Sequence, residues 1–468
     1  MFDHTTYISP FTWRYASEEM RHIWSEVHRR RLMRRIWVSL AAAQHEAGLV
    51  SAEQVADLRR FADKIDIERA AEFEQRSHHD VMAEIQTFSE QAIIGGSILH
   101  WGATSADIID NADVLRLREA LNVLVQRLGE LLEVLAESME QTADLPVMAY
   151  THIQPAEPTT HGYRLAMYGQ DLLLSYGSLH RLGRSLRGKG MKGAVGTQAS
   201  FSEILAGSGM SAEAMESKVM EALDLPFFFI STQTYPRQQD LVVMQQLAAL
   251  AAVLHKFALD FRILQSPAFG EWAEPFGSQQ VGSSAMPFKR NPINSENMCS
   301  LARLVGAMPQ VMWENASQAI LERSLDDSAN RRVVLAEGFL AMDELLLRAT
   351  KIVRGMQVDK EAIGRNMATY GPFAALERLL MALVAAGADR QEAHEWLRQI
   401  SLHAWQALQQ GNNNPLSDLV LADERVRQFV DAGQVDELMD VSAHTGTAAR
   451  RARAFAEEIR NSLPGAWE

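Results

Sequence analysis

The chain has 468 residues and an acidic balance, with 45 Lys and Arg against 59 Asp and Glu and a formal net charge of −14. This length suits several domains with well-buried cores. Apolar residues make up 47% and charged residues 22% of the chain, which excludes a disordered or collagen-like protein. The negative charge argues against a surface that binds nucleic acid or anionic lipid, so any anion site must be local.

Three features bear on the compartment. The single cysteine, Cys299, permits no internal disulfide and no Cys-based zinc cluster. The first residues, MFDHTTYISPF, lack the basic and apolar regions of a signal peptide. The apolar stretch at 241–257 is interrupted by Gln245, Gln246, His255 and Lys256 and is expected to fall short of a membrane span. We therefore expect a cytoplasmic protein with no membrane and no nucleic-acid partner.

The first part of the chain, residues 1 to about 110, alternates helical patterns with breaks such as IIGGS at 93–97. Its basic run HRRRLMRR at 28–35 shares a helical period with Trp24, Ile36 and Leu40. This pattern predicts one amphipathic helix whose basic side faces solvent or another subunit.

The middle part, residues 111–357, contains two long apolar seams. The first seam is Leu117, Leu121, Leu124, Leu128, Leu131 and Leu135, and the second is Val243, Leu247, Leu250, Leu254, Phe257, Phe261 and Leu264. Pro267 ends the second pattern. Such helices must bury their seams against one another or across subunits, which predicts a helix bundle and favours an oligomer over a monomer. The run Phe227–Ile230 in this part is either a short buried strand or core beside Pro226.

The last part, residues 358–468, predicts shorter helices separated by breaks at Tyr370–Pro372 and Gly411–Pro415. The whole chain has only 28 Gly and 14 Pro, and the alternating patterns of strands are nearly absent. We therefore predict an all-α protein of three helical domains, 1–110, 111–357 and 358–468, with a central bundle of long helices.

The densest group of polar residues is Gly282–Pro292, GSSAMPFKRNP, followed by Glu296 and Asn297. Small hydroxyl residues, then two cations and an amide between two prolines, suit a loop that closes over an anionic substrate. Lys289 and Asn291 precede a helix start at Pro292, where free N–H groups and the helix dipole favour anions. The alternative is an interhelical linker, since Gly and Ser are common in linkers.

Four further clusters place polar side chains at expected turns or helix ends. They are THIQPA at 151–156, HHD at 78–80, HWGATSAD at 100–107 and RSLDDSANRR at 323–332. In the last cluster Ser328 and Arg332 are four residues apart and can share a helix face toward a phosphate. Each cluster also has a structural explanation, namely a packed or surface histidine, helix capping, or salt bridges on a solvated face.

Together these segments resemble the fumarase/aspartase superfamily, whose loop G-S-S-x-M-P-x-K-x-N-P matches Gly282–Pro292 at every fixed position. Within it the chain is similar to the adenylosuccinate lyase family, more to its animal-type members than to its shorter bacterial ones. The family's segments occur in order: Arg14-Tyr15, His79-Asp80, Thr104-Ser105, Thr151–Ala156, Gly193–Phe201, Gln233–Tyr235, Leu325–Arg332 and His444–Thr447. The resemblance thus covers nearly the whole chain.

The resemblance implies an all-α fold of three domains, a homotetramer built on a shared helix bundle, and active sites to which three subunits contribute. It implies no metal and no organic cofactor. The sequence itself has only one Glu-x-x-His spacing, Glu19 to His22, where a di-iron bundle needs two. The implied reaction is β-elimination of fumarate, from adenylosuccinate to give AMP and from succinylaminoimidazole carboxamide ribotide to give the carboxamide ribotide of purine synthesis.

The resemblance also implies roles for single residues. Ser283 is the base and His152 the acid that protonates the departing nitrogen. Ser283 then needs backbone N–H donors and a nearby cation, because a free Ser hydroxyl is too basic to ionise at neutral pH. Lys289 and Asn291 suit stabilisation of the doubly charged aci-carboxylate. Glu296 orients or charges an imidazole across the subunit interface.

The same resemblance implies the residues that bind the small-molecule substrate. Those for phosphate and ribose are Arg14, Tyr15, Ser328 and Arg332. The others are His78, His79, Asp80, Thr104, Ser105, Thr151, Gln233, Asn291 and Asn297.

The chain departs from the family pattern at four positions. His78 and Asn297 stand where animal-type members carry Arg, Phe288 replaces Tyr or His, and Trp101 replaces a smaller residue. These changes leave acid and base in place, and they bear on the strength and details of substrate binding and on the identity of the substrate. Two alternatives stay open: another fumarate-releasing lyase of the superfamily, such as one acting on argininosuccinate, and a helical scaffold that has lost catalysis. The retained Ser283 and His152 argue against the scaffold.

Overall fold

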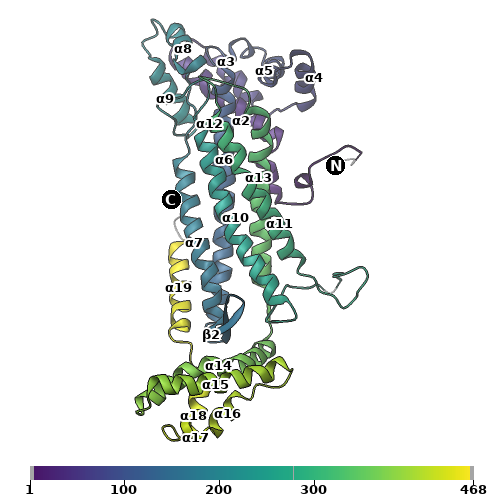
Figure 1. Cartoon of the computed structure of the whole chain (residues 1–468). Helices are drawn as coiled ribbons and strands as arrows, with labels where there is room; N and C mark the ends of the chain where they lie inside the picture. Colours follow the sequence, from purple (N-terminus) through teal and green to yellow (C-terminus); the bar gives the residue numbers. More distant parts are fainter. Residues whose placement is uncertain (1–4, 278, 464–468) are drawn as a thin grey trace. The chain divides into compact units, whose positions relative to one another are not determined.

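The structure, a computed structural model, describes residues 5–277 and 279–463 and consists almost entirely of helices (Figure 1). The predicted all-α class is confirmed. The chain divides into two compact units. Unit 1 comprises Met1–Leu128, Ser175–Ala252 and Ser300–Leu347, and unit 2 comprises Gly129–Leu174, Val253–Cys299 and Arg348–Glu468. Neither unit is continuous along the chain, so they do not correspond to the three predicted domains, and that division stays a prediction.

Five long helices contribute a segment to each unit. They are α6 (Ser105–Gln141), α7 (His161–Ser185), α10 (Gln238–Gln265), α11 (Ile293–Ala307) and α13 (Ser328–Gly355). The two predicted seams lie in α6 and α10, and every residue of both seams is buried. Burial of these faces, more than helix propensity, holds such helices in place. The helix α10 ends just before Pro267, as the pattern predicts.

The helix α10 corrects one expectation from the sequence. Among the described helices, it is the one that is long and apolar enough to cross a membrane, by length and composition only. Its four interrupting polar residues do not offset its many Leu, Val and Ala residues. Core helices of soluble proteins have the same composition, and the seam of α10 is buried within the chain. The helix is therefore weak evidence for a membrane protein.

Unit 1 also contains helices that lie wholly within it. They are η1 (Pro10–Thr12), α1 (Glu18–Ile23), α2 (Glu26–Glu46), α3 (Ala52–Phe61), α4 (Ile67–Ser77), α5 (Asp80–Gln91), η2 (Gly96–Ile98), η3 (Ala194–Gly196), α8 (Ala199–Ile204), α9 (Ala212–Ala222) and α12 (Pro309–Ser317). The helix α2 carries the basic run, and the predicted solvated face is wrong for part of it. Arg30 and Arg34 are buried and lie 2.7 and 2.6 Å from the buried carboxylate of Glu84. A buried carboxylate needs cations nearby, which explains why these arginines face inward.

Unit 2 adds four short strands and a group of helices. They are β1 (Pro146–Thr151), β2 (Gln154–Thr160), β3 (Trp272–Ala273), β4 (Gln357–Val358), α14 (Lys360–Ala385), α15 (Arg390–Gln409), α16 (Leu416–Ala422), α17 (Glu424–Arg427), α18 (Ala432–Met439) and α19 (Ala448–Ser462). Helices α14 to α18 gather around one apolar core that includes Leu379, Leu397 and Val420 (Figure 1). The predicted break at Gly411–Pro415 is confirmed, because it separates α15 from α16.

The break predicted at Tyr370–Pro372 is wrong, because α14 continues through Pro372. Proline costs one backbone hydrogen bond inside a helix. The residues that follow it, Ala375, Leu379 and Leu383, are fully buried, and this packing outweighs that loss. Both interpretations of Phe227–Ile230 are also wrong. Phe227 forms only an isolated bridge with Gly188, and Phe229 and Ile230 are 90% and 71% exposed.

Strands β1 and β2 form an antiparallel hairpin, in which Thr151 pairs with Gln154. The turn predicted around His152 is thus confirmed, although the strands on either side were not predicted. His152 and Ile153 occupy the two turn positions with φ of 54° and 60°. Two-residue hairpin turns of this kind favour Asn-Gly, because both residues need positive φ. A β-branched Ile in this conformation is strained, so the rest of the hairpin must hold it.

His161, the first residue of α7, provides a test of this part of the fold. It is fully buried, and its Nδ1 lies 2.9 Å from Thr142 Oγ1. Burial, aided by Arg164, lowers the pKa of His161 from 6.5 to about 3. Below pH 6.5, His161 therefore binds a proton in the unfolded chain, whereas in the folded chain it stays neutral down to about pH 3. The free energy of unfolding consequently falls as the pH falls.

We expect the wild-type protein to lose about 1 kcal/mol more stability between pH 6.5 and 5.5 than the His161→Gln variant. Thermal unfolding at the two pH values measures the loss in each protein. Equal losses would contradict the buried neutral imidazole.

Candidate active site

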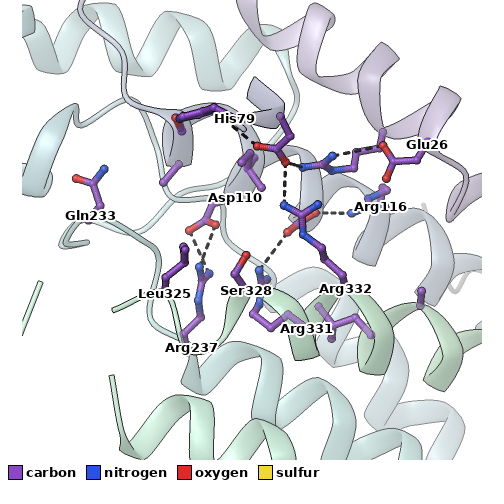
Figure 2. A pocket seen from close by; sticks show the side chains of 18 of the residues that line it. Glu26, His79, Asp110, Arg116, Gln233, Arg237, Leu325, Ser328, Arg331 and Arg332 are labelled. Carbon is purple, nitrogen blue, oxygen red and sulfur yellow. Dashed lines mark hydrogen bonds and ion pairs between the residues drawn. The ribbon is translucent and has the colours of Figure 1, made fainter. Parts of the chain in front are cut away.

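A polar cavity of about 450 Å³ lies in unit 1, where three helices begin (Figure 2). His79 and Asp80 line it from the start of α5, Ser105 from the start of α6, and Ser328 from the start of α13. The N-terminus of a helix carries a partial positive charge. Their convergence on one cavity therefore favours an anionic ligand.

The structure brings together seven of the residues predicted to bind substrate. His78, His79, Asp80, Ser105, Gln233, Ser328 and Arg332 line the cavity. Thr104 joins them, because its Oγ1 accepts a hydrogen bond from Gln233 Nε2 at 2.6 Å. Arg14 and Tyr15 lie in unit 1 but do not line the cavity. Arg14 lies over the rings of Trp13 and Tyr15, with its Cζ 5.8 Å from each centroid.

Asp80 links two arginines at the cavity. Its Oδ2 accepts from Arg332 Nη2 at 2.8 Å and from Arg29 Nη2 at 3.1 Å. Burial opposes ionisation of Asp80, but these two guanidinium groups hold its pKa below the usual value. The helix cap is His79 rather than Asp80, since His79 Nδ1 accepts from the backbone N–H of Met82 at 3.3 Å. The bond to Asp80 holds Arg332 at the cavity, although the side chain of Arg332 is half exposed.

The cavity is also lined by buried charged residues that were not predicted from the sequence as site residues. Among them are Asp110, Asp113, Arg237 and Arg331. Figure 2 shows Arg331 beside Arg332 on α13, and Arg237 facing Asp110. Arg237 donates to Asp110 at 3.1 and 3.2 Å, and Arg331 donates to Asp113 at 3.2 Å. Burial would raise the pKa of Asp113, but Arg116 and Arg331 hold it well below its usual range. These charges form a fixed floor for the cavity.

Sequence signals for that floor were weak. Asp110 and Asp113 are three residues apart on α6 and therefore share a face. Arg331 adjoins the predicted Arg332, but the sequence equally fits a solvated salt-bridged face. In the structure Arg331 is buried, donating to Asp240 at 2.7 Å and to the Tyr235 hydroxyl at 2.7 Å.

The glycine-rich segment at 189–198 is attached to the cavity wall through Asp107. This buried carboxylate pairs with the buried Lys189 and accepts from the backbone N–H groups of Lys192 and Gly193. The segment then reaches the cavity, because Val195 N donates to Gln233 Oε1 at 2.8 Å. Gln233 is thus held from both ends of its amide.

In unit 2, the loop Gly282–Pro292 is compact at its base. Asn291 Nδ2 donates to Gly282 O at 3.0 Å. A Cβ at Gly282 would lie 2.1 Å from Lys289 O, so only glycine fits there. Ser283 Oγ accepts from the backbone N–H of Met286 at 3.1 Å and of Ala285 at 3.3 Å. These are donors of the kind that the predicted base requires.

The helix start after this loop corrects another expectation. The helix α11 begins at Ile293, one residue from the predicted start, but its first N–H groups are not available to an anion. Asn294 N and Ser295 N donate to the carboxylate of Glu274 at 3.0 and 2.7 Å. The carboxylate of Glu274 thus occupies the position at the start of α11 where the helix dipole favours an anion.

The other predicted residues of unit 2 lie on two elements. Lys289 is exposed on the Gly282–Pro292 loop, and Glu296 and Asn297 follow in the first turns of α11. Thr151 and His152 lie at the exposed tip of the β1–β2 hairpin. None of these five lines the cavity of unit 1. Their catalytic and binding roles stay predictions.

Within residues 5–277 and 279–463, no three His, Cys, Asp or Glu side chains are grouped so as to hold a metal ion. The implied absence of a cofactor stays a prediction.

Known proteins match this chain over nearly its full length. A family described as lyase matches residues 12–306, and one described as the adenylosuccinate lyase C-terminus matches 372–455. Adenylosuccinate lyase from Saccharomyces cerevisiae is 36% identical over 99% of this chain and 97% of its own, and that from Schistosoma mansoni is 40% identical over 89% and 88%. The chain belongs to the adenylosuccinate lyase family. It is an enzyme of the carbon–nitrogen lyase type.

Other comparisons extend this placement. Adenylosuccinate lyase from Archaeoglobus fulgidus is 36% identical over 97% of this chain and 99% of its own length. Among solved structures, 3-carboxy-cis,cis-muconate lactonizing enzyme from Pseudomonas putida is 25% identical, with a TM-score of 0.84 over 97% of this chain and 99% of that one. The fumarase/aspartase-like fold expected of this lyase family is therefore confirmed for the described part of the chain.

Adjacent arginines of this lyase provide a matched test of the cavity floor. We expect Arg331→Met to lower the free energy of unfolding by about 3–5 kcal/mol, because it leaves the buried carboxylate of Asp240 without its cation and that of Asp113 with Arg116 alone. Arg332→Met, which removes a half-exposed partner, should cost about 1 kcal/mol or less. Urea unfolding of both variants measures the difference. Equal losses would contradict the assignment of Arg331 to the floor.

Proposed function

We propose that this enzyme releases fumarate by β-elimination from adenylosuccinate, giving AMP, and from succinylaminoimidazole carboxamide ribotide, giving the carboxamide ribotide, in purine nucleotide synthesis. The observation that carries the proposal is the cavity where Ser328 and Arg332 meet three helix starts. These substrates carry a phosphate and two carboxylates, and a chain of net charge −14 needs such a local cationic site. The names of the relatives support adenylosuccinate as a substrate.

The proposed chemistry begins with loss of a proton from the carbon next to a carboxylate. This step creates a doubly charged aci-carboxylate, which must be stabilised as it forms. Lys289 supplies a cation for it, and Asn291 an amide. Ser283 acts as the base, and the backbone N–H groups of Ala285 and Met286 that donate to its Oγ stabilise the alkoxide.

The second half of the reaction breaks the C–N bond. His152 gives its proton to the departing nitrogen, so that the product leaves as a neutral amine. The hairpin turn places this imidazole at an exposed tip, where a substrate bound to another subunit can reach it. Glu296 orients an imidazole across the subunit interface in this proposal.

A homotetramer with shared active sites and a cytoplasmic location belong to the same proposal. Large apolar side chains lie exposed along the long helices, among them Met167 (43%), Leu174 (63%) and Val333 (54%). Exposed apolar surface of this kind marks protein–protein contacts. The single cysteine fits a reducing compartment.

We expect purified protein to release fumarate from adenylosuccinate, and Ser283→Ala and His152→Ala to lower kcat by roughly 10²-fold or more. Ser284→Ala is the matched control for the loop and should keep kcat within about threefold of wild type. Fumarate absorbance in the ultraviolet measures all four proteins. Fumarate from argininosuccinate and none from adenylosuccinate would replace the substrate assignment with that of the alternative lyase.

The shared-site proposal has its own test. An inactive Ser283→Ala protein mixed with an inactive His152→Ala protein, then allowed to exchange subunits, should regain part of the wild-type activity. This follows because one mixed site can combine an intact Ser283 with an intact His152 from different chains. Sedimentation of a stable, active monomer, or no regain after proven exchange, would contradict it.

A further inference from the structure

In the sequence, the segment Glu271–Glu274 lies between the β1–β2 hairpin, which carries the proposed acid, and the Gly282–Pro292 loop, which carries the proposed base. It contains the short strand β3, which pairs with β4. Glutamates stand at both ends of this strand, and both are buried, with 0% and 6% exposure. Buried carboxylates need strong partners, and the partners of these two lie on different elements.

Glu271 connects the segment to the hairpin. Its Oε2 accepts from Arg164 Nη1 at 2.6 Å, and the same guanidinium donates to the backbone carbonyl of Met148 on β1. Its Oε1 accepts from Asn366 Nδ2 on α14 at 3.0 Å. Burial, and then the charge of Glu271, raise the pKa of Tyr150, which lies two residues before His152. One oxygen of this carboxylate thus binds the arginine that holds β1, and the other binds α14.

Glu274 connects the segment to the Gly282–Pro292 loop. Its two oxygens accept four hydrogen bonds from the first turn of α11: Asn294 N at 3.0 Å, Asn294 Nδ2 at 2.8 Å, Ser295 N at 2.7 Å and Ser295 Oγ at 2.6 Å. The loop that carries Ser283 is therefore closed at its base, because Glu274 precedes it and Asn294 follows it. Closing a loop of this length at its base restricts the conformations that its interior can adopt.

Two further contacts tighten the same base. Gln265 Oε1 accepts from Glu274 N at 2.9 Å, and Gln265 Nε2 donates to Arg290 O at 3.2 Å. The guanidinium of Arg290 lies 5.1 Å from the ring centroid of Phe276. The bridge through Gln265 and the contact between Arg290 and Phe276 each join the incoming and outgoing arms of the loop that carries Ser283.

We infer that Glu271 and Glu274 are positioning residues: Glu271 fixes the hairpin that carries His152, and Glu274 fixes the loop that carries Ser283 and Lys289. The catalytic meaning of this inference rests on the proposed roles of Ser283 and His152. Both glutamates are buried, so in this inference they act through the elements that they hold. The two glutamates flank one short strand and belong to separate hydrogen-bond networks. A substitution in one network should therefore increase the mobility of the hairpin or of the loop without affecting the other.

Hydrogen exchange of the full-length protein, followed by mass spectrometry, tests the separation. Glu274→Gln replaces one acceptor by an NH₂ that faces N–H donors, and should speed exchange at 280–292 about tenfold while 146–160 stays as in wild type. Glu271→Gln should do the reverse. The control is Glu361→Gln, an exposed glutamate in the first turn of α14, which should change neither peptide.

Milder variants cover the case in which a buried Gln prevents folding. Gln265→Leu should speed exchange at 280–292 alone, and Arg164→Lys, which cannot reach both Glu271 and Met148 O, should speed exchange at 146–160 alone. Unchanged exchange in folded variants, or equal changes in both peptides, would overturn the inference.

Fumarate release separates this inference from the proposed function. Glu274→Gln should lower kcat about tenfold or more, with a change in KM of less than about threefold, and Glu274→Asp should recover part of that loss because it keeps both acceptors. A wild-type protein that releases no fumarate refutes the proposed function, whereas the exchange pattern tests the positioning by itself.

Discussion

The pairing of buried charges is the constraint on which the candidate site depends. Asp107, Asp110 and Asp113 repeat every three residues along one face of α6, and each is buried. A buried carboxylate without a cation would be too costly to keep ionised. Their partners are Lys189, Arg237 and Arg331, which come from three other segments of the chain. Each pair therefore fixes one wall of the cavity relative to α6.

Because of this constraint, the buried charged residues bind one another and form the walls of the site, while other residues stay exposed to a ligand. Arg237 and Arg331 pair with the buried carboxylates of α6, so the residues near Arg331 on α13 are available to a ligand. Arg332 is half exposed and Ser328 lies at the first turn of the same helix. In unit 2, Glu271 and Glu274 have the corresponding internal role, while His152 and Lys289 are exposed. Rigid buried pairs thus support reactive groups that remain accessible.

Sequence patterns predicted what is local. The seams from Leu117 and Val243 gave both long helices, because a period of 3.5 residues is visible in any single stretch. Ser328 and Arg332 were found by their spacing of four. Only a resemblance to a family brought His79, Gln233 and the Gly282–Pro292 loop into one proposal, since no local pattern joins segments that lie far apart in the sequence.

What the sequence did not predict is set by tertiary contacts. Asp113 and Arg331 are 218 residues apart, so their ion pair has no local signal. Strand β2, QPAEPTT, contains two prolines and no alternating apolar residues, and it forms because β1 and α14 cover it. Helix α14 continues through Pro372 because its later turns are buried. The free helix start expected before α11 is occupied by Glu274, which no pattern near Pro292 reveals.

A crystal structure of the protein with bound AMP tests the central claim most directly, namely that the cavity of unit 1 is the nucleotide site. We expect the phosphate within hydrogen-bond distance of Ser328 and Arg332, with Asp80 still paired to Arg29. AMP bound outside this cavity, or with its phosphate away from the start of α13, would contradict it.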